Sequence, residues 1–218
     1  MDKYTTIYYV RHGESEGNAG LKNDHTHGKG SDLSERGKKQ AQERAESLAH
    51  VQFDAAFSSN LVRAIQTAEI ITLERDLAVK ATEVIRERSI ADYLLKNPDT
   101  SRNDFEIEMQ KALESLDEKA KLAYKHYPEM ESASDTASRL LTFLREIAIA
   151  YKGKTVLVVG HGNSMRSLLT HLGWAKYDEL PKGAIENTGY FILESDGTDF
   201  LIKETHGIHK QIGKRRGW

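Results

Sequence analysis

The sequence predicts an α/β fold in which a mainly parallel sheet is covered by helices on both faces. Short runs rich in β-branched and aromatic residues alternate along the chain with segments of helical periodicity. Two of these runs, Ile7 to Val10 and Val156 to Val159, contain no charged residue, which is typical of strands buried on both faces. The alternation is interrupted by residues 92–130, a polar region with a turn and a helical pattern.

Composition suits one globular domain over residues 1–218. The chain has 218 residues, of which 39% are hydrophobic, enough for a sizeable core. A formal net charge of −2 argues against a nucleic-acid partner, and the basic residues between Lys210 and Arg216 fit a solvated tail. The absence of cysteine excludes disulfides and thiolate metal sites. Because the sequence shows neither a signal core nor an apolar run of membrane-spanning length, we expect a cytoplasmic protein without a membrane partner; the oligomeric state stays open.

Local signals place the individual strands and helices. Ser34 is expected to cap the first helix, and Asn163 or Ser164 the last one, because short polar side chains accept hydrogen bonds from the first helical N–H groups. Asp196-Gly197 predicts the turn of a closing hairpin. The expected strands span residues 5–10, 53–58, 81–85, the run that ends at His161, and the hairpin strands 189–193 and 200–204. The expected helices span residues 35–49, 61–73, 134–151 and 165–172.

Residues 92–130 are expected to form a helical cap insertion over the strand ends rather than a separate domain. Apolar residues recur there at helical spacing, which predicts one amphipathic helix over residues 104–127. The residues of this stripe are Phe105, Met109, Ala112, Leu116 and Ala120.

Two of the expected strands run directly into a His-Gly pair. Arg11-His12-Gly13 follows the first strand, and His161-Gly162 follows a later one. Because the carboxyl ends of neighbouring parallel strands meet at one edge of a sheet, we expect both histidines in one site. Glycine at position 13 lets the backbone approach a ligand, with its N–H expected to be free to donate.

A third stretch adds positive charge to this edge. Arg63 lies in the first turn of the helix that follows the expected cap Ser58-Ser59-Asn60. Together with Arg11, His12 and His161 it supplies two guanidiniums, two imidazoles and a helix N-terminus. This combination predicts a pocket for a phosphate dianion.

These stretches together resemble the histidine phosphatase superfamily, also called phosphoglycerate mutase-like. The resemblance covers the chain from Tyr8 to about Leu193 with the motifs in the expected order. The matching motifs are Arg11-His12-Gly13-Glu14-Ser15, Ser58-Ser59 with Arg63-Ala64 and Gln66-Thr67-Ala68, and His161-Gly162; weaker matches are Asp32 to Gly37, Glu131-Ser132 with Arg139, and Asn187-Thr188.

The resemblance implies a three-layer α/β/α sandwich with one antiparallel strand, and a phosphatase that hydrolyses phosphate monoesters through a phosphohistidine. His12 would be the nucleophile, and a neutral imidazole needs no activating base at neutral pH. The transferring phosphate would be held by Arg11, Arg63 and His161, with Asn18, the Gly13 amide and Gly162.

The general acid for the leaving oxygen is expected to be Glu87, in Arg86-Glu87-Arg88 directly after the third strand. Members of the family usually continue Glu-Arg-x-x-Gly and often a Glu-Gly pair. This chain has Ala91 in place of that glycine and Leu94-Leu95 in place of the pair. A solvated Glu87 therefore stays an alternative, with Asp92 and Glu14 as the other candidate acids.

A metal site stays as a second alternative. Asp24, His25 and His27 precede the second motif and could join His12 and His161 around an ion. Histidines in a glycine-rich loop are more often solvated, and the resemblance implies neither a metal nor another cofactor.

Two competing functions remain: a phosphoglycerate mutase and a catalytically silent protein that binds a phosphorylated ligand. The mutase branch usually carries an Arg-Arg pair in its cap, whereas residues 92–130 contain only Arg102 and are acidic overall. Hydrolysis of a small-molecule phosphate ester is therefore expected, with a phosphoprotein substrate left open. The sequence does not identify the ester.

Overall fold

A computed structural model describes residues 4–21, 30–88 and 101–211, which form a six-stranded sheet in the order β3-β2-β4-β1-β5-β6. β1 pairs in parallel with β4, β4 with β2, and β2 with β3, while β5 runs antiparallel to both β1 and β6. Among the described strands, β5 is thus the one that runs antiparallel to all the others. The predicted α/β fold with a mainly parallel sheet is confirmed. The strands are β1 (Thr5–Arg11), β2 (Ala55–Ser59), β3 (Val79–Thr82), β4 (Thr155–Gly160), β5 (Ile185–Ser195) and β6 (Phe200–Ile208).

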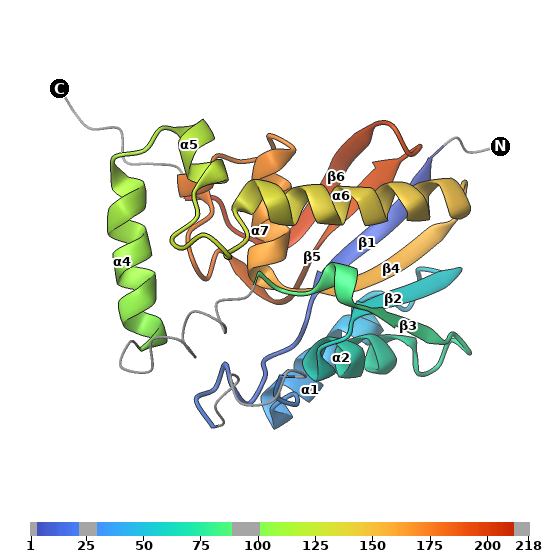
Figure 1. Ribbon diagram of the computed structural model, residues 1–218. Coiled ribbons are helices and arrows are strands. Elements are labelled where there is room, and N and C mark those ends of the chain that lie inside the picture. The colour runs from blue at the N-terminus through green and yellow to red at the C-terminus, as the bar shows by residue number, and fades with distance from the viewer. Residues whose placement is uncertain (1–3, 22–29, 89–100, 212–218) are drawn as a thin grey trace.

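Helices cover both faces of this sheet, which gives the expected three layers. Figure 1 shows α6 and α7 on one side of the strands and α1 and α2 on the other. The covering helices are α1 (Glu35–Ser47), α2 (Val62–Thr72), α6 (Ala133–Ala150) and α7 (Gly162–His171).

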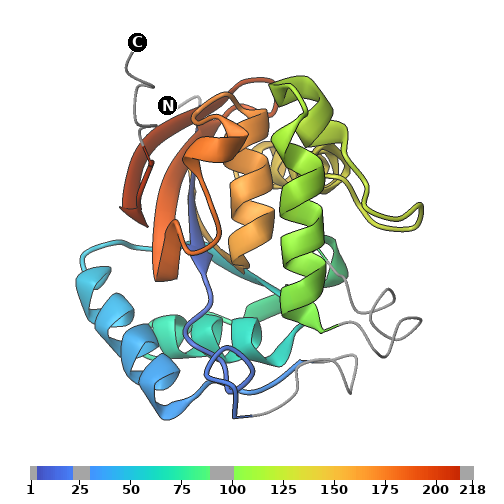
Figure 2. The same ribbon diagram turned by 90° about the vertical axis from the view of Figure 1, so that its left-hand side faces the viewer.

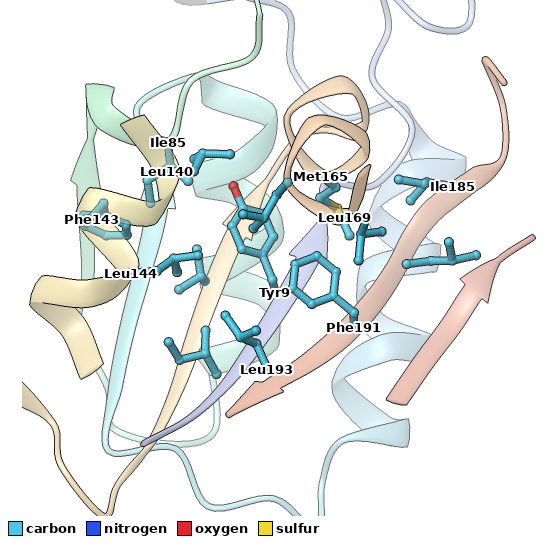
Figure 3. Close-up of a cluster of buried hydrophobic side chains, with 14 of the residues drawn as sticks. Tyr9, Ile85, Leu140, Phe143, Leu144, Met165, Leu169, Ile185, Phe191 and Leu193 are labelled. Carbon is cyan, nitrogen blue, oxygen red and sulfur yellow. The ribbon is translucent and has the colours of Figure 1, made fainter. Parts of the chain in front are cut away.

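The central strands feed two hydrophobic cores, because successive side chains of a strand point to opposite faces. On β1, Ile7 and Tyr9 enter the core under α6 and α7, while Tyr8 and Val10 enter the one under α1 and α2. In the first core, Tyr9 stacks on Phe191 of β5 with ring centroids 5.3 Å apart (Figure 3). Packing on both faces makes β1 and β4 rigid supports for the residues at their carboxyl ends.

The register of β1 and β4 brings the two His-Gly motifs to one edge. Arg11 is paired with Gly160, and the His12 N–H donates to the Gly160 carbonyl at 3.0 Å. Each histidine therefore comes directly after the last pair of its ladder.

The cap contains two described helices instead of the single expected helix over residues 104–127. These are α4 (Arg102–Glu114) and α5 (Glu118–Ala123), on the side of the molecule toward which β1 runs (Figures 1 and 2). The chain leaves α4 at Ser115, and the Asp117 side chain then accepts a bond from the Ala120 N–H to start α5. The spacing of apolar residues does not reveal where a helix is interrupted. The interruption is favoured by Asp117, whose side chain caps the start of a second helix.

Three smaller predictions are wrong. The strand expected over residues 81–85 ends at Thr82, whose hydroxyl accepts from the Val84 N–H and starts a 3₁₀ turn over Glu83–Ile85. The expected cap Ser58-Ser59-Asn60 does not cap α2, because the N-cap residue is Leu61, which makes no side-chain cap bond. The N-cap of α7 is His161, not Asn163 or Ser164.

The Ser34 cap and the hairpin turn are as expected. The Ser34 hydroxyl accepts from the Gly37 N–H, and Asp196 accepts from the N–H groups of Thr198 and Asp199. No helix within the described ranges is both long and apolar enough to cross a bilayer.

Candidate active site

His12 is 3% exposed and hydrogen-bonded at both ring nitrogens. Its Nδ1 lies 2.6 Å from the Gly13 carbonyl oxygen, and its Nε2 lies 3.1 Å from Nε of Arg63. The carbonyl only accepts and the guanidinium only donates, so Nδ1 carries the proton and Nε2 keeps its lone pair. The lone pair that a nucleophile needs is thus present at Nε2.

Burial favours the neutral form of His12. Desolvation, followed by the charges of Arg63 and Arg11, lowers the pKa of His12 well below its usual value, although the bond to Gly13 opposes this. The imidazole is therefore uncharged at neutral pH.

His161 lies edge-on to His12, with ring centroids 5.1 Å apart. It is fully buried, and neither ring nitrogen has a hydrogen-bond partner among the described residues. Desolvation, with Arg63 and other nearby positive groups, lowers the pKa of His161 well below its usual value. A buried neutral imidazole with an unsatisfied N–H costs about 1–3 kcal/mol, which an acceptor oxygen from a ligand would relieve.

Two guanidiniums flank the histidines. Arg63 is held through its backbone as well, because its carbonyl accepts from the Thr67 hydroxyl at 2.7 Å. Arg11 donates through Nη1 to the Ile185 carbonyl, and its buried Nε has no partner in the described part of the chain. A Cβ at position 162 would stand 3.2 Å from this Nε, so Gly162 keeps space beside it.

The Gly13 N–H is not free, contrary to prediction. It donates to the Thr67 hydroxyl oxygen at 3.0 Å. A Cβ at position 13 would lie 2.5 Å from the Gly37 carbonyl oxygen, so glycine is required here for close packing against α1. The amide therefore stabilises the strand end instead of lining the cavity.

A cavity of about 130 Å³, called the phosphate pocket below, lies at this edge. It brings together most of the residues that the sequence singled out, whereas His161 is fully buried and is not among its lining residues. The predicted residues in its lining are Arg11, His12, Asn18, Arg63, Glu87 and Gly162.

Glu87 is fixed at the start of α7. Its Oε1 accepts from the N–H groups of Arg88 and Ser164 and from the Ser164 hydroxyl, each at 2.9 Å. Its Oε2 accepts from the Asn163 N–H at 3.0 Å. A carboxylate at a helix N-terminus is stabilised by the orphan N–H groups there. Because Oε2 accepts one hydrogen bond, it retains a lone pair that can bind a proton.

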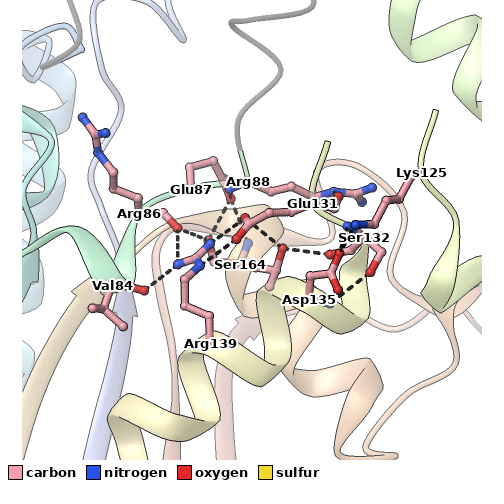
Figure 4. Close-up of polar contacts among 11 residues, drawn as sticks. Val84, Arg86, Glu87, Arg88, Lys125, Glu131, Ser132, Asp135, Arg139 and Ser164 are labelled. Carbon is pink, nitrogen blue, oxygen red and sulfur yellow. Dashed lines mark hydrogen bonds and ion pairs between the residues drawn. The ribbon is translucent and has the colours of Figure 1, made fainter. Parts of the chain in front are cut away.

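A polar network holds the Glu87 segment from behind (Figure 4). Arg139 of α6 donates to the Val84 and Arg86 carbonyls and grips both carboxylate oxygens of Glu131, at 2.8 and 2.7 Å. Arg88 in turn donates to the Glu131 carbonyl. Bidentate pairs of this kind fix orientation, so the weak match Glu131-Ser132 with Arg139 belongs to the support of Glu87.

The alternative acids and the metal candidates do not join the described site. Glu14 accepts from the Ser34 hydroxyl at 2.8 Å and pairs with Arg36, so it is committed to the start of α1. Asp92, Asp24, His25 and His27 lie outside the described residues. Within the described ranges, no three acidic or histidine side chains are grouped as metal ligands would be.

Sequence reasoning named several further residues of this edge without predicting how they position the site. The Asn187 amide donates to the His12 carbonyl at 3.2 Å, and Thr188, at a φ of 56°, donates its N–H to the same oxygen at 3.4 Å. The left-handed backbone of a β-branched residue is strained and is kept only where its surroundings demand it. The position of Thr67 four residues after Arg63 is a sequence signal for the hydrogen bond between its hydroxyl and the Arg63 carbonyl. No comparable sequence signal indicates the hydrogen bond from the Ser164 hydroxyl to Glu87.

A second and larger cavity of about 550 Å³, the cap cavity, lies between the cap and α7. Residues of α4 form one wall, and Arg166 and Tyr177 contribute to the other. Asn163, Arg166 and Lys182 line both cavities, so the two spaces adjoin.

Comparison with known proteins gives a consistent result. The sequence profile of the histidine phosphatase superfamily (branch 1) matches residues 7–206. A phosphoglycerate mutase of Schizosaccharomyces pombe is 34% identical over 91% of this chain and 94% of its own length. The structure of Bacillus stearothermophilus YhfR superposes with a TM-score of 0.72 at 26% identity, covering 91% of this chain and 95% of that one. A mycobacterial glucosyl-3-phosphoglycerate phosphatase solved with VO3 has a TM-score of 0.68 at 23% identity, covering 93% and 98%, and shows the likeness of fold.

Proposed function

Because the chain belongs to the histidine phosphatase superfamily (branch 1), we propose that it hydrolyses phosphate monoesters through a phosphohistidine at His12. One observation carries the proposal: the His12 proton is bound by the Gly13 carbonyl, and the Nε2 lone pair faces the Arg63 guanidinium. In the structure this lone pair accepts a hydrogen bond from Arg63 Nε, and a phosphate oxygen that takes over this N–H would free Nε2 to attack the phosphorus.

The first step is attack of His12 Nε2 on the phosphorus. The N–P bond forms as the ester P–O bond breaks, and the leaving oxygen takes a proton from Glu87. Arg11 and Arg63 stabilise the charge on the equatorial oxygens, and His161 donates its unpaired N–H to one of them. In the second step Glu87 takes a proton from water, which attacks the phosphohistidine and releases inorganic phosphate.

Hydrolysis is favoured over transfer to a second alcohol by the space beside the nucleophile. The cap cavity of about 550 Å³ adjoins the phosphate pocket and offers water a route to the phosphohistidine. After Arg102, the charged residues of α4 and α5 are five acids, Asp104, Glu106, Glu108, Glu114 and Glu118, and three lysines, Lys111, Lys119 and Lys121. Such a cap attracts a small acidic substrate poorly.

A phosphoglycerate mutase is the second candidate, favoured by the name of the Schizosaccharomyces pombe relative. A mutase must shelter its phosphoenzyme from water while the intermediate reorients. In both functions His12 receives the phosphoryl group in the same way. They differ in whether water or a second alcohol then accepts it from His12.

One enzyme preparation decides between them. Release of inorganic phosphate from phenyl phosphate and from 3-phosphoglycerate is measured beside interconversion of phosphoglycerates, with His12→Ala purified in parallel as the control for contaminating enzymes. The proposal predicts phosphate release that exceeds interconversion. Faster interconversion would make the protein a mutase, and no turnover of any ester would leave a silent binding protein.

The proposed chemistry uses only side chains for positive charge and for the nucleophile. Chelator treatment should leave the rate unchanged, and vanadate should inhibit because it adopts five-coordinate geometry. Activity that is lost to a chelator and restored by a divalent ion would contradict the proposal.

A further inference from the structure

We propose that Arg44, in the last turn of α1, is a positioning residue for the nucleophile: it holds Thr188, and Thr188 in turn holds the backbone of His12. The inference rests on the proposed function for the role of His12. It goes beyond that function because it assigns part of the catalytic rate to a cation that does not line the phosphate pocket.

The backbone of His12 lies beyond the last regular pair between β1 and β5. That pair is Val10 with Tyr190, and the ladder between β5 and β6 is irregular in the residues before Tyr190. Continuing the antiparallel count places Thr188 opposite His12. The Thr188 N–H and the Asn187 amide both donate to the His12 carbonyl, at 3.4 and 3.2 Å. Because both bonds are long, the carbonyl stays in place only if Thr188 does.

Thr188 needs support to remain in this conformation. Its φ of 56° is in the left-handed region, which a β-branched residue leaves unless its surroundings hold it there. The support comes from α1, because the Thr188 carbonyl oxygen accepts from Nε of Arg44 at 2.9 Å. This bond fixes the peptide that follows Thr188 and so restrains the residue whose N–H is aimed at His12.

Arg44 is itself held on two further sides. Its guanidinium lies 4.7 Å from the centroid of the Tyr190 ring, and its Nη1 donates to the Ser47 hydroxyl at 3.1 Å. The Tyr190 ring stacks in turn on His206 of β6, with ring centroids 4.5 Å apart. A planar guanidinium suits this place, because it stacks on a ring with its face and donates from its edge. A lysine would supply the charge without the flat face.

The other end of the β5–β6 hairpin contains a matched arginine. Arg145 of α6 donates through Nε to the Gly197 carbonyl at 2.8 Å and lies 5.7 Å from the centroid of the Phe200 ring. Both arginines therefore bind a backbone carbonyl of the hairpin segment from a helix and lie over an aromatic ring. Gly197, however, follows the end of β5 that pairs with Thr5 at the start of β1, whereas His12 follows the end of β1.

Kinetics of matched variants test the inference. Arg44→Met, Arg44→Lys and Arg145→Met are compared with the wild type in the hydrolysis of phenyl phosphate. Arg44→Met should lower kcat about 10- to 100-fold, because a small displacement of a reacting group has an effect of this size. KM should stay nearly unchanged, since the groups that bind the phosphate are intact. Arg44→Lys should recover part of kcat, and Arg145→Met should lower the melting temperature but not kcat.

A second substitution tests the path through Thr188. Glycine adopts the left-handed backbone without strain, so Thr188→Gly should restore part of the kcat that Arg44→Met loses. If Arg44→Met does not fold, Arg44→Lys takes its place in every comparison, with a smaller loss of kcat expected.

NMR of protein labelled with ¹⁵N-histidine tests the inference without turnover. The Nδ1 proton of His12, which is bonded to the Gly13 carbonyl at 2.6 Å, is identified by its absence in His12→Ala. We expect this resonance to shift, and its exchange with water to accelerate, in Arg44→Met and not in Arg145→Met.

An unchanged His12 resonance in Arg44→Met, or an unchanged kcat beside an active wild type, would overturn the inference. A loss of kcat that Arg145→Met reproduces, or that Thr188→Gly does not relieve, would also overturn it. If the wild type releases no phosphate from any ester but the His12 resonance responds to Arg44→Met alone, the proposed hydrolysis is contradicted and the positioning of His12 by Arg44 stands.

Discussion

At the carboxyl edge of β1 and β4 the candidate catalytic groups stand at the ends of largely buried strands, whereas in the cap α5 has no buried side chain. His12 is held at both ring nitrogens, and Glu87 accepts four hydrogen bonds. The cap, in contrast, contributes Leu113 to a small hydrophobic cluster that it shares with Ala133 of α6 and with Tyr177, together with partly buried neighbours. Its ion pairs to the rest of the chain include exposed side chains: Lys182 is 74% exposed opposite Glu106, and Asp178 is 63% exposed opposite Lys121.

The difference separates two tasks. Reacting groups must be held within a fraction of an ångström of their productive geometry, which a packed sheet provides. The cap, which must let the alcohol portion of an ester enter and leave, is better built from elements of low local stability. We therefore expect changes at the strand ends to act on the chemistry, and changes in the cap to act on substrate affinity.

The largest expected effect is that of His12→Ala. Loss of the nucleophile should lower kcat by roughly 10⁴- to 10⁶-fold, as for other covalent catalysts. His50→Ala, an exposed histidine after α1, should leave kcat unchanged. The measurement is phosphate release from phenyl phosphate, and a His12→Ala rate near that of the wild type would end the proposed mechanism.

Glu87→Gln should affect esters according to their leaving groups. An alkyl alkoxide needs protonation and should be released about 10²- to 10⁴-fold more slowly, whereas a nitrophenolate leaves without help. Glu83→Gln, an exposed acid four residues earlier, serves as the control. Equal losses with alkyl and nitrophenyl phosphates would assign Glu87 a structural role only.

A matched pair of leucines compares the two regions directly. Leu144 of α6 and Leu113 of α4 are both nearly fully buried, but Leu144 lies in the main core and Leu113 in the small cap cluster. Leu144→Ala should lower the free energy of unfolding by about 2–5 kcal/mol. Leu113→Ala should lower it less and raise KM instead. Urea unfolding and steady-state kinetics check this, and equal stability losses would show that cap and sheet unfold as one unit.

The smallest expected effect is on the pH dependence of stability. The pKa of His161 is lower in the folded than in the unfolded protein, so the unfolded state binds the extra proton as the pH falls. The stability contributed by a neutral His161 is complete above pH 6.5 and is lost progressively below it. Between pH 6.5 and about 5.5 the wild type should therefore lose about 1 kcal/mol more than His161→Gln. Identical losses in urea titrations would contradict the assigned burial effect.

The strand-end geometry could be predicted from sequence because it depends on few rules. Uncharged strands pair in parallel at the centre of a sheet, and the residues after their carboxyl ends must meet there. That placed His12, His161 and Arg11 together, and the polar cap of α2 placed Arg63, although the expected cap bond itself is absent.

The rest depends on contacts between residues far apart in the chain. Nothing near Gly13 shows that Thr67 accepts from its N–H, or that Glu87 instead of Asn163 satisfies the start of α7.

The most direct test of the account is to trap the intermediate. The enzyme is mixed with ³²P-labelled substrate and quenched within a turnover, and the labelled peptide is identified. The account predicts a phosphoryl group that is labile in acid, stable in alkali and located on His12, with none in His12→Ala. Turnover without a labelled enzyme, or a label on another residue, would contradict it.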